Sequence, residues 1–533
     1  MDRAPAPRRR FPTWPVLLVV ASTLLLGSAS LIMPFGRDQG IHAFIADSML
    51  SGKVVYRDVF NVKPPLTTVI HALALLLFGH SMTAIRLLDL LWTLGTALAI
   101  FLFCRRALKR DWLAAVAGAF YPFLYYLLGF WYTAQTDGWL NLPLLGALLL
   151  ALPAGGAWTA RPLRWLAAGA CIGIAVLIKY TAAALLPLLI VVVLVAQRRA
   201  VAQGVRASLG LTLGFVLPLA LCSLSLLVSG AMPAFIESEF GLVPAYAMVS
   251  KSHGLIARLV DMLRVPGSAP QLRLAAVLFV PGLIAGVFFL ARRREWRYGF
   301  RLVGALLATA FVSTFSQGKF FVYHYLPFLP VVALVSGLLL YAVLAPLSRR
   351  IHKAAGVAIG AVVAAVLFTA SGYPALFRDL GSVVSGKQRL HDYWMSSRFN
   401  MGQDYSLRDD ILLADYLRET TRPADRVFIW GFEPTVNFLA RRWTVSRFLY
   451  DFPMVIDWNP QRFRDELMNM YVNDPAEVFV VEHNDVTPWA SGSEQDSFEA
   501  LMGFPELRDF IPTRYVRDRS IGRFDVFRLA VMH

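Results

Sequence analysis

The chain has 533 residues, of which 57% are hydrophobic and only 16% are charged, and it carries a formal net charge of +16. A mean hydropathy of +0.55 excludes an ordinary soluble globular domain. The apolar residues form blocks of about 15 to 23 residues separated by short basic clusters, which is the pattern of a multi-pass membrane protein.

Membrane helices are predicted in about eleven apolar blocks, because a helix satisfies its own backbone hydrogen bonds inside a bilayer. The blocks 164–178 and 180–196 meet at Lys179 and Tyr180 and are interpreted as two crossings, with one bent re-entrant pair as the alternative. The predicted spans are 13–34, 82–104, 112–129, 137–153, 164–178, 180–196, 207–229, 272–291, 300–316, 325–347 and 353–372.

Basic clusters occupy every second connection between these spans, and such clusters stay on the cytoplasmic side. The amino terminus is therefore predicted inside, whereas residues 35–81, 230–271 and everything after residue 373 are predicted outside, in the periplasm or extracellular space. This asymmetry explains the net charge, so no nucleic-acid partner is predicted. The Ala, Leu and Arg richness is typical of bacterial chains and favours the bacterial inner membrane. The clusters contain Arg8, Arg9, Arg10; Arg105, Arg106, Lys109, Arg110; Arg161, Arg164; Arg198, Arg199, Arg206; Arg292, Arg293, Arg294, Arg297; and Arg349, Arg350, Lys353.

Several common functional signatures are absent from the sequence. Cys104, Cys171 and Cys222 fall in or beside predicted spans, so no disulfide framework or cysteine-based zinc site is predicted outside the membrane. The chain contains no P-loop, no GxGxxG segment and no HExxH pair. Nucleotide-driven transport and redox chemistry with a soluble cofactor therefore lack their usual motifs.

The first outer loop begins where the first predicted span emerges, and Asp38 lies at this point. Residues 41–50 have apolar side chains along one helical face, and residues 66–80 are almost entirely apolar but short for a membrane crossing. Both segments are predicted to lie as interfacial helices along the outer membrane boundary. Asp38 is then expected at the level of the lipid headgroups.

The second half of this loop, YRDVFNVKPP, combines charges with two prolines. Lys63 precedes Pro64 and Pro65, whose fixed φ angles stiffen the chain and orient the lysine. Arg57 and Asp58 are interpreted as structural, with Asp58 pairing with Arg57 or Lys53. The loop is therefore predicted to hold a carboxylate and a cation close together.

Other polar residues are predicted at the same outer level. Charges near or inside a membrane are costly, so they tend to be functional. Together these side chains predict an outward-facing polar pocket suited to a lipid-linked, negatively charged substrate. The residues are Asp137 at the start of the fourth span, Lys179, Lys319, His324 and Tyr325.

A change to an ordinary globular composition past residue 373 predicts a separate carboxyl-terminal domain. The predicted boundaries are 1–372 for the membrane region, 373–405 for an interfacial connector and 406–533 for a small α/β domain. Glu433 and the cluster at 482–484 are interpreted as solvated residues without a chemical role. The expected elements are a capped helix and a buried strand in 406–431, a helix in 433–442, a strand in 476–483 and an edge strand in 522–532.

The acidic residue beyond the first span, the YRDVFNVKPP segment, Asp137 and the late HYLPFLP segment together resemble the GT-C glycosyltransferases. Within them the chain is similar to the family 39-like group, which includes the lipid A aminoarabinose transferase and the protein O-mannosyltransferases. The resemblance covers the membrane region, with the KPP loop as its most specific part. It implies a multi-pass GT-C fold of about eleven helices with an extracytoplasmic α/β domain.

The resemblance also implies an inverting transferase that moves a sugar from a polyprenyl-phosphate-linked donor to a hydroxyl group of lipopolysaccharide, another envelope glycan, a glycolipid or a protein. Asp38 is the expected general base, with Asp137 as a second catalytic candidate. Gln39 stands where familiar members have a second acidic residue, so neither a metal nor a cofactor is expected. The departing phosphate requires positive charge or hydrogen-bond donors, for which the candidates are Lys63, Arg37, Lys319, His324 and Tyr325.

Each candidate also has a structural interpretation. Asp38 is otherwise a solvated helix-end carboxylate, Lys63 a lysine pairing with lipid phosphate, and Asp137 the cap of the fourth span. His324 is otherwise a core histidine and Tyr325 an interfacial anchor. A transporter or flippase of lipid-linked glycans is the alternative function, although the two halves of the chain show no inverted repeat. A non-catalytic scaffold leaves the charged first loop unexplained.

Overall fold

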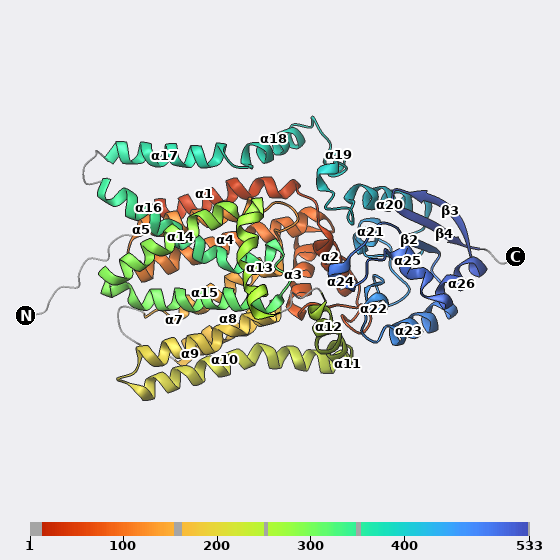
Figure 1. The fold of residues 1–533 in the computed structure, drawn as a ribbon, viewed down its shortest axis with the longest axis horizontal. Coiled ribbons are helices and arrows are strands. Elements are labelled where there is room, and N and C mark those ends of the chain that lie inside the picture. Colours follow the sequence, from red (N-terminus) through yellow and green to blue (C-terminus); the bar gives the residue numbers. More distant parts are fainter. Residues whose placement is uncertain (1–12, 154–161, 250–253, 348–352, 531–533) are drawn as a thin grey trace, which may run out of the picture.

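Figure 1 shows the computed structural model of the chain, which describes residues 13–153, 162–249, 254–347 and 353–530. A bundle of long helices occupies one end of the molecule, and a mixed region with a small sheet occupies the other (Figure 1). The bundle consists of α1 (Trp14–Ser28) with η1 (Ala29–Ile32), α4 (Met82–Leu108), α5 (Asp111–Tyr126), α6 (Thr136–Trp139) with α7 (Asn141–Ala151), α8 (Pro162–Ile178), η2 (Tyr180–Ala184) with α9 (Leu185–Ala196), α10 (Val201–Val228), α14 (Pro270–Arg292), η4 (Arg294–Trp296) with α15 (Arg297–Gln317), η5 (Val322–Phe328) with α16 (Leu329–Leu347), and α17 (Lys353–Thr369).

All eleven predicted spans are helical, but they differ in length. By length and composition, six of the described helices can cross a membrane, or seven if the bent pair Gly360–Thr369 and Tyr373–Val384 forms one span. The other predicted spans are helices too short to cross a membrane fully, so fewer full crossings are supported than the predicted number of about eleven. Between α8 and η2, Lys179 is a single extended residue with φ −157°, so the two blocks that meet there are separate helices.

The connections between α9 and α10 and between α14 and α15 lie at the end of the bundle away from the sheet (Figure 1). Both connections carry basic clusters, so these clusters share one end of the molecule, as the predicted orientation requires. Among the predicted cytoplasmic residues, those outside the described part of the chain are Arg8, Arg9, Arg10, Arg161, Arg349 and Arg350.

The two helices of the first outer loop are α2 (Arg37–Leu50) and α3 (Pro65–Phe78). The prediction of an interfacial helix is wrong for α2, because its apolar face, including Phe44 and Ile45, is buried between α3 and α21 (Pro434–Ala440). By contrast, α3 leaves Leu76 and Leu77 exposed along one side. An exposed apolar side is consistent with contact to lipid.

The outer segment between α10 and α14 is also helical in its described parts. Its elements are α11 (Met232–Ile236), the π-helical turn η3 (Glu237–Leu242), α12 (Val243–Met248) and α13 (Leu255–Ser268). In Figure 1, α11 and α12 lie at the lower edge where the bundle meets the carboxyl-terminal region, whereas α13 lies across the bundle.

The carboxyl-terminal region contains one four-stranded sheet with strand order β1-β2-β4-β3. Strands β1 and β2 are parallel, and β4 is antiparallel to both β2 and β3. The predicted edge strand is therefore wrong, because β4 lies between β2 and β3. Its elements are α18 (Tyr373–Val384), α19 (Leu390–Trp394), η6 (Ser397–Phe399), α20 (Leu407–Thr420), β1 (Val427–Trp430), α21, α22 (Phe452–Val455), α23 (Pro460–Asn473), β2 (Val478–Glu482), α24 (Pro488–Ser491), α25 (Ser497–Met502), α26 (Pro505–Arg514), β3 (Tyr515–Ile521) and β4 (Phe524–Leu529).

The other predicted elements of this region are present. The Ser406 hydroxyl caps α20 by accepting a hydrogen bond from the Asp409 amide, and β1 is fully buried. In the connector, the Trp394 indole donates a 2.8 Å hydrogen bond to the Ile32 carbonyl at the last residue of η1. The connector thus ties the carboxyl-terminal region to the first helix of the bundle.

Candidate active site

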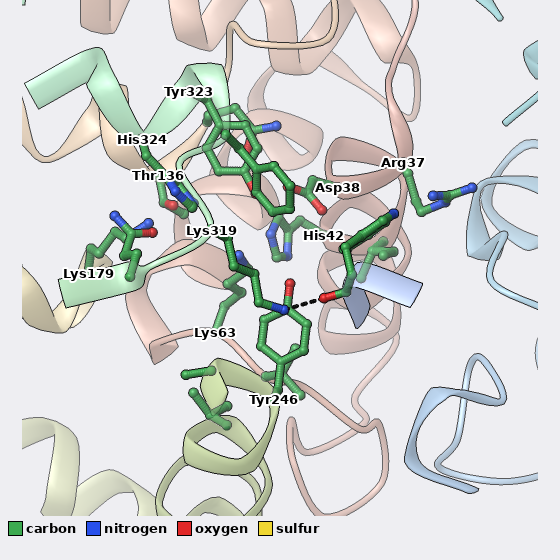
Figure 2. Close-up of a pocket in the computed structure, with 18 of the residues that line it drawn as sticks. Arg37, Asp38, His42, Lys63, Thr136, Lys179, Tyr246, Lys319, Tyr323 and His324 are labelled. Atoms are coloured by element: carbon green, nitrogen blue, oxygen red, sulfur yellow. Dashed lines mark hydrogen bonds between the residues drawn. The ribbon is translucent and has the colours of Figure 1, made fainter. Parts of the chain in front are cut away.

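A cavity of about 580 Å³ lies where the helical bundle meets the carboxyl-terminal region. Its wall is formed by α2, the loop before α3, the junction of α8 and η2, η3 with α12, the segment from α15 to η5, and loops of the carboxyl-terminal region. Figure 2 shows side chains from several of these elements pointing into the same space. Six of the residues predicted for the polar pocket and its chemistry line this cavity, namely Arg37, Asp38, Lys63, Lys179, Lys319 and His324.

Asp38 lies in the first turn of α2 and is partly exposed to the cavity. Tyr323 lies beside the Asp38 carboxylate and interacts with it, and both side chains are labelled in Figure 2. Lys179 is close enough to interact electrostatically with this carboxylate. The carboxylate therefore faces open space, with a hydroxyl and a cation nearby.

The backbone of Lys63 is fixed by hydrogen bonds to the side chains of two neighbouring residues. The Tyr56 hydroxyl and Asn61 Nδ2 donate hydrogen bonds of 2.6 and 3.0 Å to the Lys63 carbonyl, and Asn61 Oδ1 accepts a 3.1 Å bond from the Lys63 backbone amide. The Lys63 ammonium has no hydrogen bond or ion pair among the residues that the structure describes. A fixed backbone with an uncommitted ammonium is suited to binding an anion.

Arg57 and Asp58 pair with each other, as predicted. Arg57 Nε lies 2.7 Å from Asp58 Oδ1, and a second Arg57 nitrogen donates to the Ser229 carbonyl at 2.8 Å. Asp58 also accepts a 2.9 Å bond from the Val54 amide. Both side chains support the loop that carries Lys63, while Pro64 lines the cavity and Pro65 begins α3.

Asp137 is fully buried and is not among the residues that line the cavity, so the expectation that it forms part of the pocket wall is wrong. Its carboxylate lies 2.5 Å from Lys179 Nζ and accepts a 3.2 Å bond from the Gln317 amide. The N-cap of α6 is Gln135, so the capping interpretation is also wrong. Asp137 instead fixes Lys179, which does line the cavity.

Lys319 connects the helical bundle with the carboxyl-terminal region. Its ammonium donates a 2.5 Å hydrogen bond to the Trp489 carbonyl in α24 and lies 3.3 Å from the centroid of the Tyr246 ring (Figure 2). His324 lies next along the same wall, and its Nδ1 has no hydrogen-bond partner among the described residues. Tyr325 does not line the cavity, because its hydroxyl donates to the Met262 carbonyl at 2.6 Å.

Arg37 reaches away from the cavity toward the carboxyl-terminal region (Figure 2). Arg37 Nε lies 2.9 Å from Glu433 Oε1, and Arg37 Nη1 lies 2.9 Å from Asp404 Oδ2. Burial lowers the pKa of Arg37, but the nearby carboxylates of Glu433 and Asp404 raise it by more, so the pKa of Arg37 lies above its usual value. These bonds commit the guanidinium to carboxylates and disfavour the predicted contact with the donor phosphate.

Glu433 is buried with 0% exposure, so its interpretation as a solvated residue is wrong. Burial raises its pKa, and Arg37 and Arg523 oppose that rise. Arg523 Nη2 lies 3.2 Å from Glu433 and 2.9 Å from Glu482, which is equally buried. The sequence-based interpretation failed because both carboxylates find partners far away in the chain.

The contact between α2 and α21 is very close. A Cβ atom on Gly40 would lie 1.8 Å from the Thr435 hydroxyl oxygen, so only glycine fits at this position. The close approach and the Arg37 ion pairs dock the carboxyl-terminal region on the helix that carries Asp38. The position of Asp38 therefore depends on both parts of the protein.

Sequence reasoning missed two buried polar residues in the cavity wall, Glu239 and His42. Both are 4% exposed, and their charge-bearing atoms have no hydrogen-bond partner among the described residues. Burial lowers the pKa of His42 well below its usual range, with His71 and Lys63 adding to the effect. Burial raises the pKa of Glu239 to about 8, opposed by Tyr180 and Lys63. The signal in the sequence was that His42 and Glu239 both lie in predicted outer loops.

Gln39 lies in the first turn of α2 and bonds to backbone atoms. Its amide oxygen accepts a 3.0 Å bond from the Gly36 amide, and its amide nitrogen donates a 2.7 Å bond to the Thr133 carbonyl. Gln39 therefore fixes the start of α2 rather than facing the cavity. Within the described residues, no group of three or more His, Cys, Asp or Glu side chains is arranged to hold a metal ion.

A family model described as dolichyl-phosphate-mannose-protein mannosyltransferase matches residues 62–224. No curated protein sequence matches the chain. ArnT from Cupriavidus metallidurans bound to undecaprenyl phosphate is 17% identical with a TM-score of 0.57, covering 98% of this chain and 99% of ArnT.

An oligosaccharyltransferase from Archaeoglobus fulgidus, solved with a tethered acceptor peptide, is 13% identical with a TM-score of 0.52. That match covers 98% of this chain and 74% of the archaeal protein. These likenesses confirm the predicted fold: the chain is a multi-pass helical membrane protein with a GT-C fold and a small sheet in its carboxyl-terminal region.

Proposed function

We propose that this protein is an inverting glycosyltransferase that moves a sugar from a polyprenyl-phosphate-linked donor to a hydroxyl acceptor on the extracytoplasmic face of the membrane. The observation that carries this proposal is the placement of Asp38 and an uncommitted Lys63 on the wall of one cavity. The ArnT structure named above was solved with undecaprenyl phosphate, which supports a lipid phosphate as the common part of the substrate.

The proposed reaction needs two groups with opposite tasks. Asp38 accepts the proton of the acceptor hydroxyl as that oxygen attacks the anomeric carbon. Lys63, with Lys179 and Lys319 behind it, stabilises the negative charge that develops on the departing phosphate. Attack from the face opposite the phosphate inverts the anomeric configuration. The acceptor is a cell-envelope glycan, a glycolipid or a protein.

The direct test uses lipid extracts from a strain that lacks the protein, because the unused donor accumulates there. Purified protein in liposomes is mixed with this extract and with envelope material from the same strain. A transferase releases free polyprenyl phosphate and adds one sugar-sized mass to the acceptor, with an inverted anomeric signal by NMR. A transporter or flippase moves the donor across the bilayer and leaves it intact, which would overturn the proposal.

Lys63→Met is expected to weaken binding of polyprenyl phosphate by about tenfold to a hundredfold, because a charge-assisted hydrogen bond contributes about 1.5–3 kcal/mol. The measurement is titration of the purified protein with undecaprenyl phosphate in nanodiscs. Lys53→Met is the matched control, since Lys53 lies in the same loop over the Trp443 ring, outside the cavity wall. Equal affinities for the two variants would remove Lys63 from the phosphate site.

We also propose that the reaction proceeds without a metal ion, because lysine side chains supply the positive charge and Gln39 is bound to backbone atoms. Incubation with a chelator followed by gel filtration is expected to leave the rate of sugar transfer unchanged. A loss of activity that manganese restores would contradict this prediction.

A further inference from the structure

Glu239 is a buried carboxyl group that the two roles proposed above do not use. It lies in the π-helical turn η3, and such turns are frequent at functional sites. The Tyr180 hydroxyl lies beside it and interacts with it, and apart from this contact the two carboxyl oxygens have no hydrogen-bond partner among the described residues. A buried carboxyl group with so few partners is rare in a folded protein, so a bound ligand is a natural explanation.

The turn η3 is joined directly to the loop that carries Lys63. The Ser238 hydroxyl donates a short hydrogen bond to the Asn61 carbonyl, and Asn61 in turn bonds the backbone of Lys63. Glu239 follows Ser238 in the chain, so this bond places Glu239 and Lys63 on one part of the cavity wall. The two side chains interact electrostatically, yet they form no ion pair with each other.

The same turn is fixed from its other side by the carboxyl-terminal region. Arg447 and Arg462 lie 3.0 and 2.6 Å from the two carboxylate oxygens of Glu237. A Cβ atom on Gly241 would lie 2.6 Å from the Trp458 ring, so the backbone fits closely beneath that ring. Glu239 is therefore held in position before any ligand binds, which lowers the entropic cost of binding.

We propose that Glu239 and Lys63 form one phosphate-binding site, in which the un-ionised Glu239 carboxyl donates a hydrogen bond to a phosphate oxygen of the lipid-linked donor. This inference rests on the proposed function and adds a neutral acid to its phosphate site.

During transfer the bond between the anomeric carbon and the bridging oxygen breaks, and its electron pair stays on that oxygen. The acceptor oxygen bonds to the anomeric carbon, and its proton passes to Asp38. The Glu239 proton stays on Glu239, whose hydrogen bond strengthens as phosphate charge grows.

The protonation state follows from the surroundings of Glu239. Burial raises its pKa to about 8, while Tyr180 and the Lys63 ammonium act in the opposite direction. Tyr56 and Tyr450 are the other titratable groups that interact with it, and both are phenols. The carboxyl group is thus mostly protonated at about pH 7 and mostly ionised at about pH 9. An ionised Glu239 repels phosphate, so affinity must fall as the pH rises through about 8.

The test is titration of the full-length protein in nanodiscs with undecaprenyl phosphate at about pH 7 and about pH 9. Wild-type affinity is expected to fall about tenfold across this range, following the protonated fraction of Glu239. Glu239→Gln keeps a neutral donor and is expected to show no such fall. Glu239→Leu has no donor and is expected to bind about tenfold more weakly at pH 7.

Glu237→Gln is the matched control. Glu237 lies in the same turn but faces Arg447 and Arg462, so this variant should keep the wild-type pH dependence even if its thermal stability drops. If Lys63→Met loses affinity while both Glu239 variants titrate like wild type, the Glu239 inference is wrong and the proposed function survives. If wild type shows no saturable binding and Lys63→Met makes no difference, the proposed function itself fails.

Discussion

Asp38→Asn is expected to lower the rate of sugar transfer by about 10² to 10⁴, the usual cost of removing a general base. The amide keeps the shape of the side chain, and Asp38 forms no ion pair among the described residues, so folding should be unaffected. The measurement is the time course of the sugar-sized mass on the acceptor, by mass spectrometry, after the variant is induced in a deletion strain.

Asp47→Asn is the matched control for this prediction. It makes the same chemical change on the same helix, but Asp47 pairs with His80 at 3.3 Å and lies outside the cavity wall. At equal membrane levels, Asp47→Asn should transfer sugar at the wild-type rate. If Asp38→Asn restores transfer as fast as this control, Asp38 is not the base and a transport role gains support.

Much of the fold could be predicted because its signals are local. Each apolar block became a helix, and the capping serine and buried strands of the carboxyl-terminal region followed from short patterns. The number of full crossings was harder to predict, because several apolar blocks form helices that are too short to span a membrane. The error with β4 has a similar origin, since strand order is set by pairing and not by the residues of one strand.

Residues of the candidate site were predicted where position along the chain was enough. Asp38 lies at the start of the first outer loop and Lys63 in its second half, and both line the cavity. Asp137 was misjudged because its partner Lys179 comes from another helix, and the sequence does not show which charges neutralise each other. A carboxylate in a polar segment and a buried carboxylate in an ion pair look alike in one sequence.

Glu239 and Glu433 were missed for a related reason. Their burial results from packing between the bundle and the carboxyl-terminal region, which brings together segments that are far apart in the chain. Lys319 crosses the same boundary through its bond to Trp489. The cavity is therefore a joint product of both regions, and the carboxyl-terminal region contributes to the site by fixing α2 and η3.

Arg37→Met is expected to destabilise the docking of the carboxyl-terminal region by about 3–5 kcal/mol, because it leaves the buried Glu433 carboxylate with fewer partners. The measurements are the thermal unfolding temperature of the purified protein and the rate of protease cleavage in the connector 373–405. Both should change strongly, and transfer activity should fall with them since Asp38 is the next residue. Unchanged cleavage and melting would show that this ion pair does not hold the two regions together.

The loss of stability in Arg37→Met should depend on pH in a predictable direction. Burial already raises the pKa of Glu433, and removing Arg37 removes the largest opposing influence. The folded variant then binds a proton that the unfolded chain has lost, so stability decreases as the pH rises above the unfolded pKa of about 4.3. The defect of Arg37→Met should therefore be smaller at about pH 5.5 than at about pH 8.

Adding Glu433→Gln should remove this pH dependence and restore part of the stability, because Arg523 keeps Glu482 as a partner. A double variant as unstable and as pH-dependent as Arg37→Met would place the cost elsewhere, with Asp404 as the remaining partner of Arg37.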